Sequence, residues 1–166
     1  MKNSFWKGLR GQFFAVGLIS VALLAVSVII TCVFVVRTAM YGQVRAELEG
    51  CVEYIQKYYD GMEGDFKLVV NEDKSGAIYK GDKDITNDYS VLDSFSESFD
   101  ADVSIFCTDV RALTTFRDGD GNRMINTGTS AIVSGDVYEG GHDAFYSNVL
   151  IGEDKYFAYY RPILNS

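Results

Sequence analysis

The sequence predicts an α+β fold, in which one long amino-terminal helix precedes an antiparallel sheet with short helices. Three observations lead to this prediction. Residues 13–36 are an uninterrupted apolar run, and residues 38–60 place apolar side chains at a spacing of three and four. Residues 103–163 then hold short runs of β-branched and aromatic residues separated by turns. Helices followed by antiparallel strands define an α+β module.

The apolar run from Phe13 to Val36 is predicted to be a transmembrane helix. It contains no charged residue and no Asn, Gln or His. At about 1.5 Å per residue it spans about 36 Å, against about 30 Å of bilayer hydrocarbon. A cleaved signal peptide is the alternative, but its apolar core would be about 7–15 residues long, with a small-residue cleavage site behind it. Here Arg37 follows the run directly.

The charges on the two sides of this run predict its orientation. Lys2, Lys7 and Arg10 precede it, and no acidic residue does. Cationic flanks favour the cytoplasmic side of a membrane. We therefore expect residues 1–12 to form a cytoplasmic amino terminus, residues 13–36 to be the membrane helix, and all later residues to lie outside the cell.

The part of the chain after the membrane run is strongly acidic. It holds all 23 acidic residues and 12 of the 15 cationic ones, which gives it a formal charge of −11. Such a charge disfavours binding to nucleic acids and to anionic lipid headgroups. Its length of about 130 residues is enough for one domain with a core of its own.

Residues 37–65 are predicted to be an extracellular stalk helix that continues the membrane helix. Its apolar stripe includes Leu48, Val52 and Ile55, and no proline separates it from the membrane run. We expect one helix that ends near Asp60. The alternative is a separate helix after a bend at Gly42, since glycine weakens a helix.

Residues 66–116 are predicted to hold four strands and one helix. Asn87 and Asp88 can cap the helix, whose apolar positions are Val91, Leu92 and Phe95. Two strands separated by only a few residues form a hairpin. The expected strands are residues 66–70, 77–79, 103–108 and 112–116.

Two more strands and a short helix are predicted after a turn at residues 118–122. The turn sequence DGDGN imitates a calcium loop, but Arg123 replaces the glycine at the sixth position and Thr129 the glutamate at the twelfth. We therefore expect a turn without metal. A short helix opens at Thr129-Ser130 and stops at Gly135, and strands are expected at residues 144–151 and 156–163.

No residue pattern indicates catalysis, a metal or a cofactor, so we expect a protein that is not an enzyme. The chain has no G-x-S-x-G, no phosphate-binding glycine loop and no CxxC, and His142 is its one histidine. Two cysteines, Cys51 and Cys107, lie outside the membrane run. Extracellular thiols can pair, but these two are expected to be unpaired, as small residues in a helix face and a strand.

Binding is the function class that the residues favour. Alternation along the last strand places Tyr156 and Tyr160 on one face, and Tyr159 and Arg161 on the other. Arginines beside tyrosine and threonine hydroxyls can hold a small carboxylate through charge-assisted hydrogen bonds. Alternatively, the tyrosines are core residues and the arginines form surface ion pairs. The candidate ligand-binding residues are Arg111, Thr114, Arg123, Tyr156, Tyr160 and Arg161.

The order of motifs resembles the single-Cache extracellular sensor domains. These PAS-like input modules belong to bacterial chemoreceptors, histidine kinases and diguanylate cyclases. The stretches DADVSIFCTDVRALTTFRDGDGNRMINTGTS, VSGDVYEG and KYFAYYRPI follow one another as the family's motifs do, with YKGD and Ile85 upstream. The resemblance covers about residues 38–163. The matching positions are Phe106, Asp109, Arg111, Thr114, Arg123, Gly128, Thr129, Gly135, Tyr138, Gly140, Tyr156, Tyr160, Pro162 and Ile163.

This resemblance implies a sensor domain at residues 66–166. In such domains a small metabolite, commonly a carboxylate, binds on the membrane-distal sheet, and the flanking helices carry the signal across the bilayer. We also expect a homodimer through the stalk helix. The competing hypothesis is a membrane-anchored structural or interaction protein that binds a protein partner, for which a flat exposed apolar patch would take the place of a polar pocket.

The resemblance also implies a further strand between residues 103–108 and 156–163, then a second membrane helix and a cytoplasmic output domain. The sequence ends at Ser166, so we expect a sheet whose last strand is missing. The strands beside that position would then keep unpaired backbone groups.

The orientation can be tested by cysteine accessibility. A cysteine introduced at Ser4 should be protected from a membrane-impermeant maleimide in intact cells, and one introduced at Gly119 should be labelled, because the cationic flank keeps the amino terminus inside. The background is a chain with its three native cysteines replaced by serine. Labelling of the Ser4 position in intact cells would contradict the predicted topology.

Overall fold

The computed structural model describes residues 8–70 and 76–163 and divides the chain into two compact units. The first unit ends at Gln43 and the second begins at Val44. Helix α1, Leu9–Asp60, runs through 52 residues and belongs to both units. The structure confirms the predicted continuity, because the helical segment is unbroken from Leu9 to Asp60.

In the first unit α1 presents apolar side chains to its surroundings. Within the described residues it is the one helix long and apolar enough to cross a membrane, with a mean hydropathy of 2.9 over an 18-residue stretch. Its hydroxyl side chains are satisfied within the helix, since Ser20 donates to the Val16 carbonyl and Thr31 to the Ser27 carbonyl at 2.9 Å each. This is what a hydrocarbon environment requires of polar groups.

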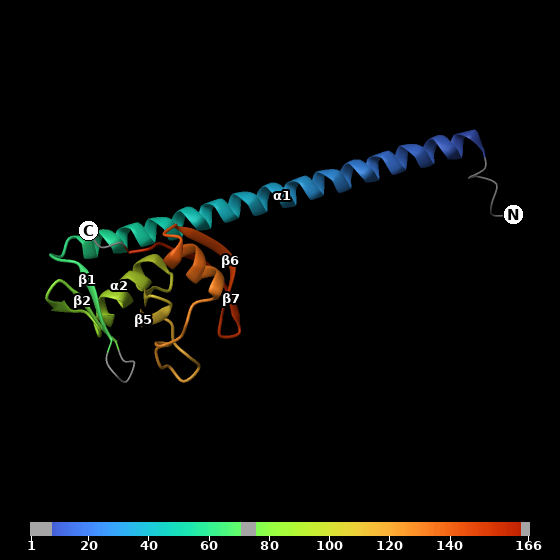
Figure 1. Cartoon of the computed structure of the whole chain (residues 1–166). Helices are drawn as coiled ribbons and strands as arrows, with labels where there is room; N and C mark the ends of the chain where they lie inside the picture. The colour runs from blue at the N-terminus through green and yellow to red at the C-terminus, as the bar shows by residue number, and fades with distance from the viewer. Residues whose placement is uncertain (1–7, 71–75, 164–166) are drawn as a thin grey trace. The chain divides into compact units, whose positions relative to one another are not determined.

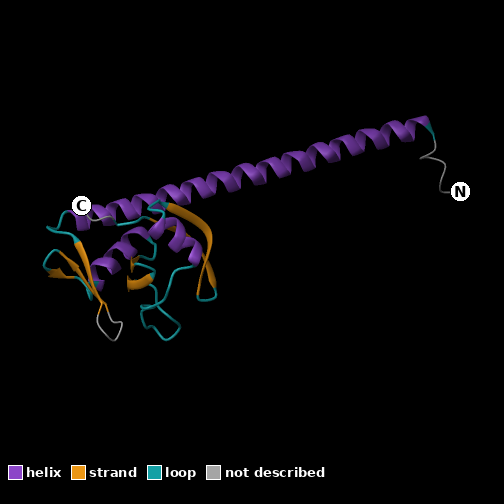
Figure 2. Ribbon diagram, in the orientation of Figure 1, coloured by secondary structure: helices purple, strands orange, loops and turns teal. Residues whose placement is uncertain are grey.

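The second unit contains three small antiparallel sheets (Figures 1 and 2). Each consists of strands that are neighbours in the sequence. The first sheet is β1 (Phe66–Val70), β2 (Gly76–Lys80) and β3 (Lys83–Asp84), the second is β4 (Ser104–Cys107) with β5 (Val110–Thr114), and the third is β6 (Ala144–Ile151) with β7 (Asp154–Tyr160). This arrangement confirms the α+β class, and β4 with β5 forms the hairpin predicted from their short separation in the sequence.

Three helical segments accompany the sheets, shown in purple in Figure 2. Helix α2 (Tyr89–Phe99) has Asp88 at its N-cap position, as predicted, but the Asp88 side chain makes no capping hydrogen bond and pairs with Lys83 instead. Helix α3 (Ala131–Val133) is capped by the Ser130 side chain. The π-helix η2 (Ser134–Glu139) follows it directly.

The core joins the end of α1 to the sheets. Tyr59 of α1 is 2% exposed and packs with a group of buried apolar side chains. This group takes members from five further segments of the second unit, so the apolar stripe of the stalk is a core face. The core residues are Tyr59, Ile78, Ile85, Leu92, Ile105 and Leu113.

The clearest differences from the sequence prediction lie in β5, which begins at Val110 rather than Ala112, in the short helix and in the last strand. The short helix does not stop at Gly135, because the Gly140 amide donates to the Gly135 carbonyl and the chain continues as a π-helix. The last strand begins at Asp154, since Gly152 takes φ +63° and closes a two-residue loop. It ends at Tyr160, short of Pro162, which has no amide hydrogen to donate.

The β4–β5 pair and the β6–β7 pair are separate ladders. Among the described residues no strand lies between β4 and β7, although the resemblance places one there. Side chains of the two strands nevertheless meet, because the rings of Phe106 and Tyr160 lie with centroids 6.1 Å apart. The space beside these rings forms the cavities described below.

Substitution of Leu113 tests which residues form the core of the second unit. Its side chain is 0% exposed, so Leu113→Ala should lower the free energy of unfolding by about 2–5 kcal/mol through lost burial and a cavity. Leu150→Ala is the matched control, because Leu150 is 65% exposed and its truncation should change stability by less than about 0.5 kcal/mol. Thermal unfolding of both variants in lipid nanodiscs measures the difference, and equal losses would contradict the assigned core.

Candidate ligand-binding site

Two neighbouring cavities lie between β4, β7 and the last turns of α1. The larger has a volume of about 330 Å³ and the smaller about 120 Å³. The larger falls within the range of about 300–1,000 Å³ that is usual for small-molecule pockets. Seven residues belong to the walls of both cavities, so the two are adjacent parts of one groove. These residues are Val52, Ile55, Val103, Ser104, Phe106, Tyr159 and Tyr160.

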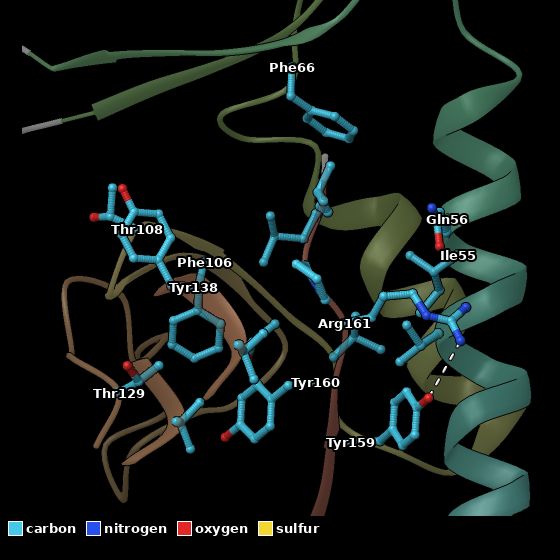
Figure 3. Close-up of a pocket in the computed structure, with 18 of the residues that line it drawn as sticks. Ile55, Gln56, Phe66, Phe106, Thr108, Thr129, Tyr138, Tyr159, Tyr160 and Arg161 are labelled. Carbon is cyan, nitrogen blue, oxygen red and sulfur yellow. Dashed lines mark hydrogen bonds between the residues drawn. The ribbon is translucent and has the colours of Figure 1, made fainter. Parts of the chain in front are cut away.

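The larger cavity has mainly apolar walls. Figure 3 shows Ile55 and Gln56 reaching toward it from α1, while Phe106 and Tyr138 approach from the opposite side. Helix η2 contributes Val137 and Tyr138 to this wall. π-Helical segments are rare and are found often at functional sites.

Backbone strain occurs at the edge of the same cavity. Thr108, which lines the larger cavity, has φ +57°. This left-handed conformation is an outlier for a β-branched residue and costs of order 1–3 kcal/mol. The surrounding hydrogen bonds hold it, since the Thr108 hydroxyl donates to the Cys107 carbonyl at 2.6 Å.

Arg111 is the buried charge of the smaller cavity. Its side chain comes from β5 and is 6% exposed, and its guanidinium lies over the rings of Phe106 and Phe116, at 5.2 and 5.3 Å from their centroids. Nη1 donates to the Thr127 hydroxyl at 3.1 Å, and Nε is buried without a hydrogen-bond partner. Arg111 therefore has donor capacity that the described part of the chain leaves unused.

The electrostatic surroundings of Arg111 fit an incoming anion. Burial lowers the pKa of the guanidinium, while the nearby Tyr160 and Asp102 raise it. Asp102 is engaged elsewhere, because it accepts a hydrogen bond from the Thr115 hydroxyl at 2.8 Å. Within residues 8–70 and 76–163, no acidic side chain forms an ion pair with Arg111.

Tyr156 and Tyr160 lie beside Arg111, on the face of β7 that alternation predicts. Tyr160 packs on Phe106, and Tyr156 makes an edge contact with Phe116 at 5.3 Å. Both tyrosines line the smaller cavity. Burial raises the pKa of Tyr160 above its ordinary value, so its hydroxyl stays neutral and can donate.

Arg123 and Thr114 lie together but already have partners. Arg123 binds Asp93 through two parallel hydrogen bonds of 2.9 and 2.6 Å, and its Nη1 also donates to the Thr114 carbonyl. The guanidinium stacks 4.2 Å from the ring centroid of Tyr89. The Thr114 hydroxyl is hydrogen-bonded to Ser104 at 2.8 Å. This group fastens α2 to β5.

Arg161 joins the end of β7 to α1. Its Nε donates to Asp143 at 2.8 Å, and its Nη2 lies 3.8 Å from a Glu49 carboxylate oxygen of α1. Tyr159 donates to the same Asp143 carboxylate at 2.7 Å, and Figure 3 shows its contact with Arg161. These hydrogen bonds lower the pKa of Asp143, against the opposing effect of its partial burial.

Helix α1 contributes Val52 and Ile55 to the walls of both cavities. Helical periodicity predicts the apolar stripe that holds these residues, but it does not identify the surface that the stripe covers. Cys51 lines the smaller cavity as well. Cys32, Cys51 and Cys107 are free cysteines in the structure. Among the described residues no group of histidine, cysteine or acidic side chains is placed to hold a metal ion.

The second unit thus combines an α+β fold with cavities of ligand size between two of its strand pairs. The family model described as Single cache domain 3 matches residues 83–166, which is 84 of the 166 residues. The chain therefore belongs to the single Cache domain 3 family, as the motif order predicts. The chain matches no curated protein and no solved structure.

Membership of this family defines the general character of the protein. Cache domains are non-catalytic input modules of receptors, and they bind small molecules outside the cell. The long apolar α1 fits a membrane protein with one such sensor domain.

The Arg123–Asp93 pair predicts a pH-dependent contribution to stability. Arg123 lowers the pKa of Asp93, so the pair stabilises the fold above the unfolded-state pKa of about 3.9 and loses this effect as the pH falls through the lower folded value. Asp93→Asn should reduce the midpoint of thermal unfolding at pH 7, and this difference should vanish as the pH drops below about 4.

Glu97→Gln is the control for this experiment, because Glu97 is an exposed acid on the same helix. Its unfolding midpoint should follow that of the wild type at every pH. A deficit of Asp93→Asn that is constant with pH would show that the carboxylate charge is not the cause.

Proposed function

We propose that this chain is the extracellular ligand-sensing part of a bacterial transmembrane receptor and that it binds a small carboxylate at Arg111. The supporting observation is the state of that side chain: a buried guanidinium between two phenylalanine rings, with an unsatisfied Nε and no acidic partner among the described residues. A buried charge without a partner is costly, and a carboxylate bound to it removes that cost.

The geometry of the guanidinium favours a carboxylate over other anions of similar size. Arginine presents a planar set of donors that meets two carboxylate oxygens with parallel bonds. Tyr156 and Tyr160 stand beside it as additional donors. The smaller cavity, at about 120 Å³, has room for about four water molecules or a short carboxylate.

Of the six residues that the sequence nominates, the proposal gives direct ligand contact to Arg111, Tyr156 and Tyr160. Thr114 and Arg123 are assigned a supporting role, because their polar atoms hold α2 and β5 together. Arg161 is assigned to signal transmission. It lies at the larger cavity and reaches Glu49 of α1, so a ligand that moves β7 also changes a contact of the helix.

The proposal includes the arrangement of the chain in the membrane. Residues 1–12 are cytoplasmic, residues 13–36 cross the bilayer, residues 37–65 form the stalk and residues 66–166 form the sensor. The stalk also pairs with the stalk of a second copy, so that ligand binding shifts one stalk helix relative to the other. An output domain in a longer polypeptide would receive the signal.

Arg111→Met tests the site, because the two consequences of the change have opposite signs. Removing a buried, unpaired charge should leave the unliganded unfolding midpoint unchanged or raise it. The same change should cost about 2–5 kcal/mol of carboxylate binding. A thermal-shift screen of short mono- and dicarboxylates on the full chain in nanodiscs identifies the ligand, and calorimetry then measures the two affinities.

Arg117→Met is the matched control, since Arg117 is exposed and donates to the Gly121 carbonyl at 2.8 Å. It should bind the ligand as the wild type does. A ligand that is cationic or wholly apolar, or one that binds Arg111→Met with full affinity, would contradict the proposed site.

A further inference from the structure

The end of β7 carries a polar cluster that joins three segments of the second unit. Arg161 follows β7 directly, Asp143 precedes β6 directly, and Glu49 belongs to α1. Arg161 Nε donates to Asp143 at 2.8 Å, whereas Arg161 Nη2 lies 3.4 Å from the Tyr159 hydroxyl and 3.8 Å from a Glu49 carboxylate oxygen. Figure 3 shows the Arg161 side chain extended toward α1. One end of the guanidinium is therefore held by a short hydrogen bond, and the end that faces α1 is held loosely.

Four charged residues of α1 repeat at a spacing of four, so each is the neighbour of the next along the helix surface. We call them the charge row, and they are Arg45, Glu49, Glu53 and Lys57. The two acids lie in the middle of the row, with a cation at each end. Arg161 adds a third cation from the end of β7, so three cations compete for two carboxylates.

The described structure uses two of the possible pairings. Lys57 Nζ donates to Glu53 at 2.6 Å, and Arg161 pairs with Glu49. Arg45 has no ion pair with any described residue. Lys57 lowers the pKa of Glu53 through this hydrogen bond, and the charge of Arg161 lowers it further. Arg161 therefore acts electrostatically on Glu53, although it is paired with Glu49.

The ion pairs of the charge row can exchange at little cost. The side chain of Glu49 is 44% exposed, that of Glu53 is 53% exposed and that of Lys57 is 73% exposed. Ion pairs between exposed side chains are individually weak, so a change of partner alters the free energy little. Glu49 and Glu53 are one helical turn apart, which is about 5.4 Å. Rotamer changes of arginine and glutamate side chains cover such a distance.

We infer that Arg161 is a two-position contact on the charge row, which pairs with Glu49 in the described structure and with Glu53 in a second state. In the second state Arg45 pairs with Glu49 and Lys57 loses its partner, so both states contain two ion pairs. The exchange moves the unpaired cation from Arg45 to Lys57, over about 18 Å of α1. This inference rests on the transmission role proposed for Arg161, but not on the carboxylate site.

Double-mutant cycles on the full chain in lipid nanodiscs test the exchange. Arg161→Met is combined with Glu49→Gln or with Glu53→Gln, and the coupling is read from thermal unfolding midpoints at pH 7 and low salt. Arg161 should couple more strongly to Glu49 than to Glu53. In the Glu49→Gln chain its coupling to Glu53 should rise by about 1–3 °C. Lys57→Met in that chain should raise it again, because a competing cation is gone.

Glu47→Gln is the matched control, because Glu47 is an exposed acid of α1 that lies two positions before Glu49 and on another side of the helix. Its coupling to Arg161 should be zero in every chain. High salt should reduce the couplings of Arg161 to Glu49 and Glu53, since screening weakens exposed ion pairs.

The outcomes separate this inference from the function on which it rests. A coupling of Arg161 to Glu53 that rises when Glu49 is replaced supports the two positions. An unchanged coupling to Glu53, together with a coupling to Glu49, overturns the exchange and leaves the transmission role. Absence of coupling to both acids overturns the transmission role as well. The carboxylate site is tested separately by Arg111→Met.

Discussion

The packing of the last turns of α1 into the domain core is the interaction on which the rest of the second unit depends. The three small sheets are separate ladders, and α1 packs against the core that the first two of them share with α2. Tyr59 supplies one buried side chain to this core, and Val52 and Ile55 close both cavities. The same helix is thus the floor of the candidate site and the connection to the membrane segment. Any change in the packing of this face changes the site.

Arg111, Arg123 and Arg161 are alike in the sequence, but they differ in the partners that surround them in the fold. Arg123 has a bidentate carboxylate, and Arg161 has two acids of different elements. Arg111 has two phenylalanine rings and a threonine hydroxyl. Arg123 and Arg161 stabilise contacts between parts of the fold. Burial of Arg111 costs free energy in the unliganded protein, and such costs are typical of sites at which a ligand supplies the missing partner.

Much of the fold could be predicted from local patterns. Periodicity and turn residues located α1, α2 and both hairpins, because these elements are determined by neighbours in the sequence. The site could be predicted only in part. Alternation placed Tyr156 and Tyr160 on one face of β7, but the partner of each arginine depends on contacts such as that of Arg123 with Asp93, 30 positions away. The role of Val52 and Ile55 was missed because a helical stripe does not identify the surface that it covers.

The two strand edges beside the groove also bear on self-association. Within the described residues, β4 pairs with β5 alone and β7 with β6 alone, so each has a free edge that can join a strand of another molecule. Pro162, the one proline of the chain, follows β7 and cannot donate a backbone hydrogen bond. It limits how far such pairing can extend along that edge. The strands that frame the candidate site therefore also carry the edges through which two copies of the domain can associate.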